Sequence, residues 1–360
     1  MYKSFRSLLF KLQPETAHHL TLQLIRLAGI VPPSRWLLQA IFALPEKPVE
    51  AFGLKFKNPV GLAAGYDKDG IAIAGLATLG FGHVEIGTIT PRPQPGNSQP
   101  RVFRLVEDEA VINRMGFPSR GSEFVQRQLN PSLSKGFIER LIGMPSRKKT
   151  RALQPPRNTV LGINLGKNKD TPNEEAVFDY LSLLQSFAPL ADYLAINVSS
   201  PNTVGLRSLQ GRDALEALLT QLNLQRRIEQ EQLKKSIPLL VKLAPDLTDQ
   251  ELEDAIGVII DTGMDGIIAT NTTLAREGLR SNLRAESGGL SGKPLTGPGD
   301  TVLAKIVKKV GGRIPVVGVG GIMNPDDAKR KLDLGAALVQ VYTGMIYAGP
   351  GLVKEIVKKI

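Results

Sequence analysis

The residues of this chain that could carry chemistry follow short apolar runs, and most of them are amides, hydroxyls and glycines. Ser199-Ser200-Pro201-Asn202-Thr203 follows one run, Thr270-Asn271-Thr272 another, and Gly320-Gly321 a third. Two lysines accompany them, Lys68 after one run and Lys242 inside another. Such side chains suit a neutral heteroaromatic ring, whose edge alternates donors and acceptors, better than they suit hydrolysis by paired carboxylates.

Two of these features indicate an anionic ligand. Lys242 lies in an otherwise apolar run, and a buried ammonium needs an anionic partner such as the N1–C2=O edge of a reduced flavin. The glycines after the last two runs would let backbone N–H groups approach a phosphate. Taken singly, Gly320-Gly321 is also consistent with a plain strand-to-helix turn, and Lys68 with an ordinary surface residue. Their joint occurrence favours a phosphorylated ring cofactor.

The elements that must position these residues form a repeated pattern. Eight β-rich runs alternate with longer helical patterns, for example 213–235 and 249–262, which predicts a parallel sheet. The predicted strands are 60–64, 83–88, 160–165, 193–198, 239–243, 266–270, 316–319 and 338–342. Eight such units favour an α/β (β/α)8 TIM barrel, with its active site at the C-terminal ends of the strands. Residues 101–105 and 110–113 predict an inserted hairpin.

The first 45 residues are predicted to be helical. Phe5, Leu8, Leu9 and Leu12 recur at helical spacing, a second pattern spans 14–29, and a third spans about 34–44. Two interpretations are open, because these helices either pack on their own domain or present an apolar face to a bilayer surface. We therefore divide the chain into residues 1–45, a small N-terminal helical extension, and residues 46–360, a barrel with a basic insert around 130–157.

Composition excludes several classes of protein. The 360 residues contain no cysteine, which excludes disulfides, thiolate zinc sites, cysteine-ligated iron–sulfur clusters and a cysteine nucleophile. No apolar run is long enough to span a membrane, no signal peptide is evident, and we expect no metal site. The net charge is +11, but Arg147, Lys148, Lys149, Arg151 and Arg157 supply five of these charges. This excess is most simply a solvated loop rather than a nucleic-acid-binding surface.

Over nearly its whole length the sequence resembles the dihydroorotate dehydrogenase family, specifically its membrane-associated, quinone-dependent class (class 2). The matching stretches are VGLAAGYDKDG (60–70), EIGTITPRPQPGNSQPRVFRL (85–105), VINRMGF (111–117), LGINLGKNKDT (161–171), NVSSPNTVGLRSLQG (197–211), VKLAPDL (241–247), IATNTT (268–273), GGLSGKPL (288–295), VGVGGI (317–322) and VYTGMIYAGPGL (341–352). The resemblance implies one FMN per chain and oxidation of (S)-dihydroorotate to orotate, the fourth step of de novo pyrimidine (UMP) biosynthesis. It also implies a membrane quinone as the final electron acceptor.

The resemblance also implies which residues form the site. The FMN contacts fall on Ala64, Gly65, Tyr66, Asp67, Lys68, Thr88, Asn164, Asn197, Lys242, Thr270, Gly292, Gly321, Tyr342 and Thr343. The substrate contacts fall on Lys68, Asn113, Arg114, Met115, Gly116, Phe117, Asn197, Asn202, Asn271 and Thr272. Ser200 is the implied base that removes the C5 proton while hydride leaves C6 for flavin N5. Because a serine hydroxyl is a weak base, we expect a proton relay through Thr203 and an ordered water near Phe117.

Ser200 favours the quinone-dependent class, because the soluble class uses a cysteine base and one subclass recruits an iron–sulfur partner. PETAHHL (14–20) resembles the membrane-docking helix pair of the quinone-dependent class, which makes residues 1–45 the membrane and quinone-access segment. His18 or His19, Arg101 and Tyr342 are then expected around the quinone tunnel. The expected partners are dihydroorotate, orotate, a membrane quinone and the membrane surface, without nucleic acid or an iron–sulfur subunit. The expected location is peripheral, on the cytoplasmic side of a bacterial-type cell membrane.

The sequence departs from the family pattern at two places. Pro118-Ser119 stands where the family usually has an Asn pair, and the segment 130–156 is longer than usual. A longer loop near the substrate lid would change access to the site or contact with the membrane.

Three other functions compete with this interpretation. They are a soluble dihydroorotate dehydrogenase using fumarate or NAD, an FMN barrel that reduces uridines in tRNA, and a catalytically silent basic barrel that binds lipids. The missing cysteine disfavours the first two, and Ser200, Lys68 and Lys242 disfavour the third.

Overall fold

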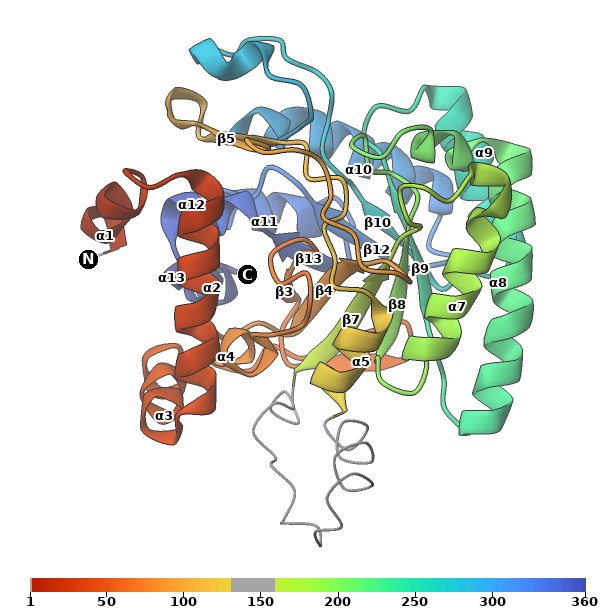
Figure 1. Cartoon of the computed structure of the whole chain (residues 1–360), viewed down its shortest axis with the longest axis horizontal. Helices are drawn as coiled ribbons and strands as arrows, with labels where there is room; N and C mark the ends of the chain where they lie inside the picture. Colours follow the sequence, from red (N-terminus) through yellow and green to blue (C-terminus); the bar gives the residue numbers. More distant parts are fainter. Residues whose placement is uncertain (1, 131–158) are drawn as a thin grey trace, which may run out of the picture.

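A closed barrel of parallel strands forms the centre of the protein (Figure 1), in a computed structural model that describes residues 2–130 and 159–360. In order around the barrel, its strands are β3 (Val60–Leu62), β4 (His83–Ile89), β7 (Val160–Leu165), β8 (Tyr193–Asn197), β9 (Leu239–Leu243), β10 (Gly266–Ala269), β12 (Val316–Val319) and β13 (Leu338–Val341). The barrel closes where β13 pairs with β3, with Gln340 opposite Gly61. The predicted (β/α)8 barrel is confirmed, and each strand begins at the predicted residue.

Helices cover the outside of the barrel (Figure 1). They are α4 (Ile73–Ala77), α5 (Ser122–Leu129), α7 (Ala176–Phe187), α8 (Arg212–Leu233), α9 (Asp249–Asp261), α10 (Thr296–Val310), α11 (Pro325–Asp333), α12 (Thr343–Ala348) and α13 (Gly351–Lys359). Short 3-10 turns are η1 (Val106–Asp108), η3 (Asn173–Glu175), η4 (Leu206–Gln210), η5 (Asn282–Ala285) and η6 (Lys293–Leu295). The start of α9 shows how sequence sets such boundaries, because Thr248 and Glu251 form a capping box there.

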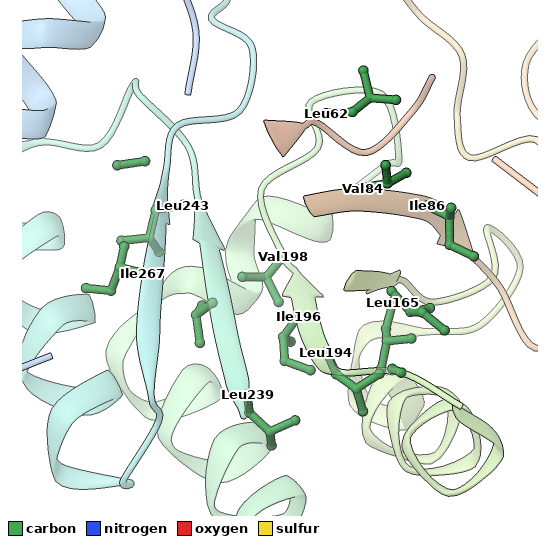
Figure 2. Packing of buried hydrophobic residues seen from close by; sticks show 14 of the residues in the cluster. Leu62, Val84, Ile86, Leu165, Leu194, Ile196, Val198, Leu239, Leu243 and Ile267 are labelled. Carbon is green, nitrogen blue, oxygen red and sulfur yellow. The ribbon is translucent and has the colours of Figure 1, made fainter. Parts of the chain in front are cut away.

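The barrel wall separates two apolar clusters, since successive strand residues face opposite sides. Val84, Ile86, Leu194 and Ile196 belong to the large cluster between the strands and the helices (Figure 2). The inner cluster includes Tyr193, which alternates with Leu194 along β8, and Phe56. Phe56 comes from a hairpin of β1 (Val49–Ala51) and β2 (Leu54–Phe56), so this hairpin contributes to the core inside the barrel. Buried polar side chains lie against this inner cluster, since the His83 ring contacts both Phe56 and Tyr193.

A small antiparallel sheet adds to the wall of the barrel opening. The predicted hairpin is confirmed as β5 (Val102–Leu105) and β6 (Ala110–Asn113). A third strand, β11 (Gly289–Gly292), pairs with β6 and places Gly289 opposite Asn113. The sequence did not predict β11, because its residues GLSG show neither apolar alternation nor β-branched side chains.

Three helices precede the barrel and lie along one flank of it (Figure 1). They are α1 (Tyr2–Leu9), α2 (Pro14–Ile30) and α3 (Pro32–Ile41). Packing of this segment on the barrel domain is confirmed for α2, which contacts α4, while the other side of α2 stays exposed and its contact with a bilayer stays a prediction. The exposed large apolar residues of this segment are Phe5, Leu8, Leu12, Leu20, Leu24, Leu27, Ile30, Val31, Trp36, Leu37 and Ile41. We call this set the apolar flank.

Two sequence expectations concern membranes and the basic insert. None of the helices within residues 2–130 and 159–360 combines the length and apolarity needed to cross a bilayer. The basic insert predicted around 130–157 lies outside the described residues, apart from Asn130, which ends α5.

Candidate active site

One cavity of about 550 Å3 connects the C-terminal ends of the barrel strands with the N-terminal helices. Its volume lies in the ordinary range for small-molecule sites. Most residues predicted for the site line it, namely Ala64, Gly65, Tyr66, Lys68, Thr88, Asn113, Met115, Gly116, Phe117, Asn197, Ser200, Asn202, Lys242, Thr270, Asn271, Thr272, Gly292, Gly321, Tyr342 and Thr343, together with His18. Among the described lining residues, Lys68, Arg104 and Lys242 are cationic and Glu15 alone is acidic. The cavity therefore suits an anionic ligand.

Six predicted residues do not line this cavity, and two of them belong to motifs near it. Asp67 is fully buried, and its carboxylate accepts hydrogen bonds from the backbone N–H groups of Ile71 and Ala72, at 3.0 and 2.7 Å. Burial raises the pKa of Asp67 to about 6. Its side chain thus holds the turn after β3 rather than facing a ligand. Asn164 lies just beneath the cavity, where it contacts the lining residues Thr88 and Asn197.

The other four lie at the edge of the site or outside it. Arg114 forms an ion pair with Glu286 at 2.6 Å and stacks on Phe103. Arg101 forms an ion pair of 2.6 Å with Glu15, which does line the cavity. His19 is exposed, whereas Thr203 is buried. Sequence motifs located these residues but not the directions of their side chains.

Three asparagines and a threonine form a connected polar floor, and two further asparagines pair beside it. Thr88 Oγ1 donates to Asn164 Oδ1 at 2.6 Å, and Asn197 Nδ2 donates to both, at 3.0 and 2.9 Å. Asn271 Nδ2 donates to Asn197 Oδ1 at 3.3 Å, and Asn202 Nδ2 donates to Asn113 Oδ1 at 3.2 Å. We call Thr88, Asn164, Asn197 and Asn271 the amide floor. Amides held in this way present fixed donors and acceptors to the edge of a planar ring.

The candidate base lies beside the amide floor. Ser200 is 5% exposed, and its Oγ accepts a hydrogen bond from the backbone N–H of Asn202 at 3.2 Å. The Thr203 hydroxyl is buried and has no hydrogen-bond partner in the described part of the chain. A buried hydroxyl without a partner is costly, so Thr203 has capacity for a further hydrogen bond. The relay through Thr203 stays a prediction.

Glu85 is a buried residue of the site that the sequence did not single out for a role. It is 0% exposed on β4, and it accepts hydrogen bonds from Asn164, Tyr193 and Gln340 at 2.9, 2.9 and 2.8 Å. Glu85 could have been identified from the sequence in the same way as Lys242, because both are ionisable residues inside a predicted buried strand.

Burial governs the acid–base properties of both lysines. The Lys68 Nζ donates to the carbonyl of Gly65 at 2.8 Å. Burial lowers the pKa of Lys68 to about 8, although the negative charges of Glu15 and Asp69 oppose this shift. Burial also lowers the pKa of Lys242, and the charge of Glu85 opposes it. Both cations thus lie where an anionic ligand would replace lost hydration.

Glycines at the end of β11 and after β12 allow close backbone packing beside the cavity. Gly292 and Gly321 line the cavity with φ of +99° and +71°. A Cβ on Gly321 would lie 2.3 Å from Thr296 Cα, at the start of α10. The glycine therefore lets the start of α10 lie against the turn after β12, and the backbone N–H groups of such a helix start suit a phosphate group. In the described residues, no group of three or more His, Asp or Glu side chains is placed to hold a metal ion.

An aromatic row connects α2 with the barrel. The His18 ring contacts Tyr66 edge-on at 5.0 Å between centroids, and Tyr66 contacts Tyr342 at 5.8 Å. Burial, with the nearby charge of Lys68, lowers the pKa of His18 to about 3, so the imidazole is neutral at ordinary pH. The same cavity extends past this row to Leu24, Leu38 and other residues of the N-terminal helices.

Pro118-Ser119, which departs from the family pattern, forms part of the wall. Pro118 lines the cavity, while Ser119 is buried and its Oγ accepts a hydrogen bond from the Gly121 N–H at 3.1 Å. Ser119 also exchanges backbone hydrogen bonds with Gln94 at 2.9 and 3.0 Å. The departure is therefore accommodated within an ordered turn.

Comparison with known proteins agrees with this geometry. A family model described as dihydroorotate dehydrogenase matches residues 48–360. A protein from Idiomarina loihiensis named dihydroorotate dehydrogenase (quinone) is 45% identical to this chain, and the alignment covers 100% of both chains. A protein of the same name from Halorhodospira halophila is 47% identical, and the alignment covers 99% of this chain and 97% of the relative. A crystal structure of DHODH from Eimeria tenella in complex with ferulenol aligns with a TM-score of 0.79 and 38% identity, covering 96% of this chain and 90% of that one. The ligand-free Eimeria tenella structure aligns with a TM-score of 0.76 and 41% identity, over 92% and 93% of the two chains.

These matches span the barrel, the N-terminal helices and the cavity between them. The names of the relatives agree on one oxidoreductase activity. The chain belongs to the dihydroorotate dehydrogenase family and is an oxidoreductase of its quinone-dependent type.

Proposed function

We propose that this enzyme oxidises (S)-dihydroorotate to orotate with FMN as hydride acceptor and a membrane quinone as final electron acceptor, the fourth step of pyrimidine (UMP) biosynthesis. One observation carries the proposal: one cavity is lined by Ser200, Asn197 and Asn271 and also reaches the N-terminal helices. When bound, FMN accepts hydride from the substrate and passes the electrons to the quinone. One FMN binds per chain.

The residues present fit FMN. Gly292, Gly321 and Thr343 line the part of the cavity that would hold the phosphate. The amide floor, with Thr270, supplies hydrogen-bonding partners for the ring, and Lys242 supplies a cation. The remaining predicted FMN residues, Ala64, Gly65, Tyr66, Asp67, Lys68 and Tyr342, lie after β3 and β13. Of these, Asp67 acts by holding the turn.

Substrate recognition follows from the planar acid ring of orotate. Lys68 provides a cation for the carboxylate, and the amides of Asn113, Asn202 and Asn271 pair with the ring amide edges. Met115, Gly116, Phe117, Asn197 and Thr272 complete the enclosure. Arg114 contributes through its backbone, because its carbonyl accepts a hydrogen bond from Asn97 Nδ2 at 3.0 Å while its guanidinium faces Glu286.

Ser200 acts as the base. Its Oγ accepts the C5 proton of dihydroorotate, and its own hydroxyl proton passes along the relay that begins at Thr203. The unpartnered Thr203 hydroxyl supports this role. Because Ser200 is buried, bulk water does not compete for the same proton.

Substrate affinity should depend on the protonation of Lys68. The pKa of Lys68 is about 8 without ligand, so the ammonium is lost as the pH rises through this value. We expect the affinity for orotate to fall by up to about tenfold per pH unit above it. The measurement is the orotate dissociation constant of the oxidised holoenzyme against pH.

Two variants test whether Lys68 causes this pH dependence of orotate affinity. Lys68→Met should bind orotate weakly at every pH and lose the dependence, whereas Lys305→Met, an exposed lysine of α10, should titrate as wild type does. Affinity that stays constant in the wild type across the alkaline range contradicts this role for Lys68.

We propose residues 1–45 as the membrane and quinone-access segment, and residues 46–360 as the FMN-binding barrel. The apolar flank supports docking on a bilayer surface, with the quinone entering between α1, α2 and α3. Around this tunnel, His18 and Tyr342 line the cavity, Arg101 holds Glu15 at its wall, and His19 lies on the outside. The location that fits is peripheral, on the cytoplasmic side of a bacterial-type cell membrane, with no nucleic acid or iron–sulfur subunit as partner.

The experiment that tests the cofactor and the substrate together uses purified protein. The protein should be yellow and release one FMN per chain on denaturation, and anaerobic dihydroorotate should bleach it. A colourless protein that does not take up added FMN contradicts the proposal. A yellow protein that dihydroorotate leaves unbleached removes the substrate assignment.

A further inference from the structure

Glu85 lies at the centre of a buried network below the amide floor. Its three hydrogen-bond donors come from three other strands, Asn164 from β7, Tyr193 from β8 and Gln340 from β13. Room for the Tyr193 ring exists because residue 162 is glycine, since a Cβ there would lie 2.1 Å from Tyr193 Cζ. The barrel thus encloses a carboxylate with three donors directed at it.

A carboxylate only accepts hydrogen bonds, and this sets the direction of every bond above it. Asn164 must turn its NH2 group to Glu85, which leaves Asn164 Oδ1 to accept from Thr88 and Asn197. Asn197 Oδ1 in turn accepts from Asn271 Nδ2 at 3.3 Å. The orientation of each amide in the floor therefore depends on the one below it, and the series begins at Glu85.

The same carboxylate is the negative charge that acts on Lys242. Lys242 is 5% exposed, and burial lowers its pKa while the charge of Glu85 opposes this. Two other titratable side chains of this network, His83 and Tyr193, are neutral at ordinary pH. Burial lowers the pKa of His83 to about 3, and burial together with Glu85 raises the pKa of Tyr193 well above its ordinary value. Glu85 and Lys242 are thus the two opposite charges of this part of the barrel.

We infer that Glu85 is a positioning residue for the flavin site, which fixes the hydrogen-bond directions of the amide floor and supplies the negative charge that balances Lys242. This inference rests on the proposed function for the identity of the cofactor. Glu85 touches neither cofactor nor substrate, and it acts through Asn164 and Lys242. A glutamine in its place has the same shape but carries no charge, and its NH2 group replaces either the oxygen that accepts from Asn164 or the oxygen that accepts from Tyr193 and Gln340.

The test compares Glu85→Gln with wild type as holoenzymes. We expect the FMN dissociation constant, measured by flavin fluorescence, to rise about tenfold, because a donor then faces a donor in the network. We also expect the plot of flavin reduction potential against pH to gain an ionisation that the wild type lacks, since Lys242 loses its opposing charge. Unchanged affinity and an unchanged plot would overturn the inference.

Three further variants separate this role from packing. Tyr193→Phe removes one hydrogen bond but keeps the carboxylate, so its pH plot should match wild type. The double variant Glu85→Gln with Lys242→Met should lack the new ionisation, which assigns that ionisation to Lys242. If Glu85→Gln does not fold, Glu85→Asp replaces it in the test. Because aspartate keeps the negative charge, its plot of flavin reduction potential against pH must match that of the wild type. A new ionisation in the Glu85→Asp plot contradicts the inference.

Failure of this inference is distinguishable from failure of the proposed function. If wild-type holoenzyme is bleached by dihydroorotate but Glu85→Gln titrates as wild type does, only the role of Glu85 is lost. If dihydroorotate does not bleach the wild type, the FMN affinities and potentials of the variants still test Glu85.

Discussion

The Ser200→Ala variant should bind FMN as tightly as wild type, yet dihydroorotate should reduce its flavin about 100- to 10,000-fold more slowly. The reason is that Ser200 is the group proposed to take the C5 proton, and alanine leaves no acceptor at that position. Ser200 lines the cavity, and within the described residues its Oγ accepts one hydrogen bond, from the Asn202 N–H at 3.2 Å. Its loss should therefore leave the amide floor intact. Stopped-flow absorbance under anaerobic conditions measures the rate.

Ser200→Cys provides the matched control for this prediction. A thiol has an ordinary pKa of about 8.5, far below that of a hydroxyl, so the cysteine variant should retain activity with a pH profile displaced to lower pH. Ser200→Ala reacting within about threefold of the wild-type rate would remove Ser200 from the role of base.

Replacing Trp36 and Leu37 together by Glu should abolish stable binding to lipid vesicles. These α3 residues are 68% and 61% exposed, and none of the residues of α3 is buried. Each such side chain contributes about 1.5–3 kcal/mol when fully buried, so losing both should lower the partition coefficient at least about 100-fold. Turnover with a vesicle-embedded quinone should fall with it, while flavin reduction by dihydroorotate stays unchanged. Vesicle co-sedimentation measures the binding.

Phe178→Glu is the control for the vesicle experiment. Phe178 is 67% exposed on α7, on the side of the barrel away from α3 (Figure 1). This variant should bind vesicles as wild type does. Equal loss of binding in both variants would indicate a general effect of added negative charge, and no loss in the Trp36 and Leu37 variant would remove the apolar flank from membrane docking.

Local sequence was sufficient to predict the barrel. Parallel strands of a barrel are buried on both faces, so most of them are short, mainly apolar runs that a sequence pattern can locate. The run at Val160–Leu165 and the run at Leu239–Leu243 match the observed strands from first to last residue. Strand β11 was missed because GLSG pairs with β6 through its backbone and has no side-chain pattern.

The site was predictable where a motif places a residue, but not where a distant contact decides its role. Ser200, Lys68 and the asparagines follow strands, and the barrel brings strand ends together. Glu85 depends on partners 79, 108 and 255 residues away in sequence. The side chains of Asp67 and Arg114 lie in the correct motifs but are held by Ala72 and Glu286. Their directions depend on tertiary packing, which no local pattern contains.

Both half-reactions are tested by mixing the holoenzyme anaerobically with dihydroorotate, recording the flavin absorbance, and then adding either a ubiquinone analogue or fumarate. We expect bleaching by dihydroorotate and rapid recovery of the absorbance with the quinone only. Recovery with fumarate and not with the quinone would contradict this expectation, because the cavity that reaches the N-terminal helices would then have no part in reoxidation.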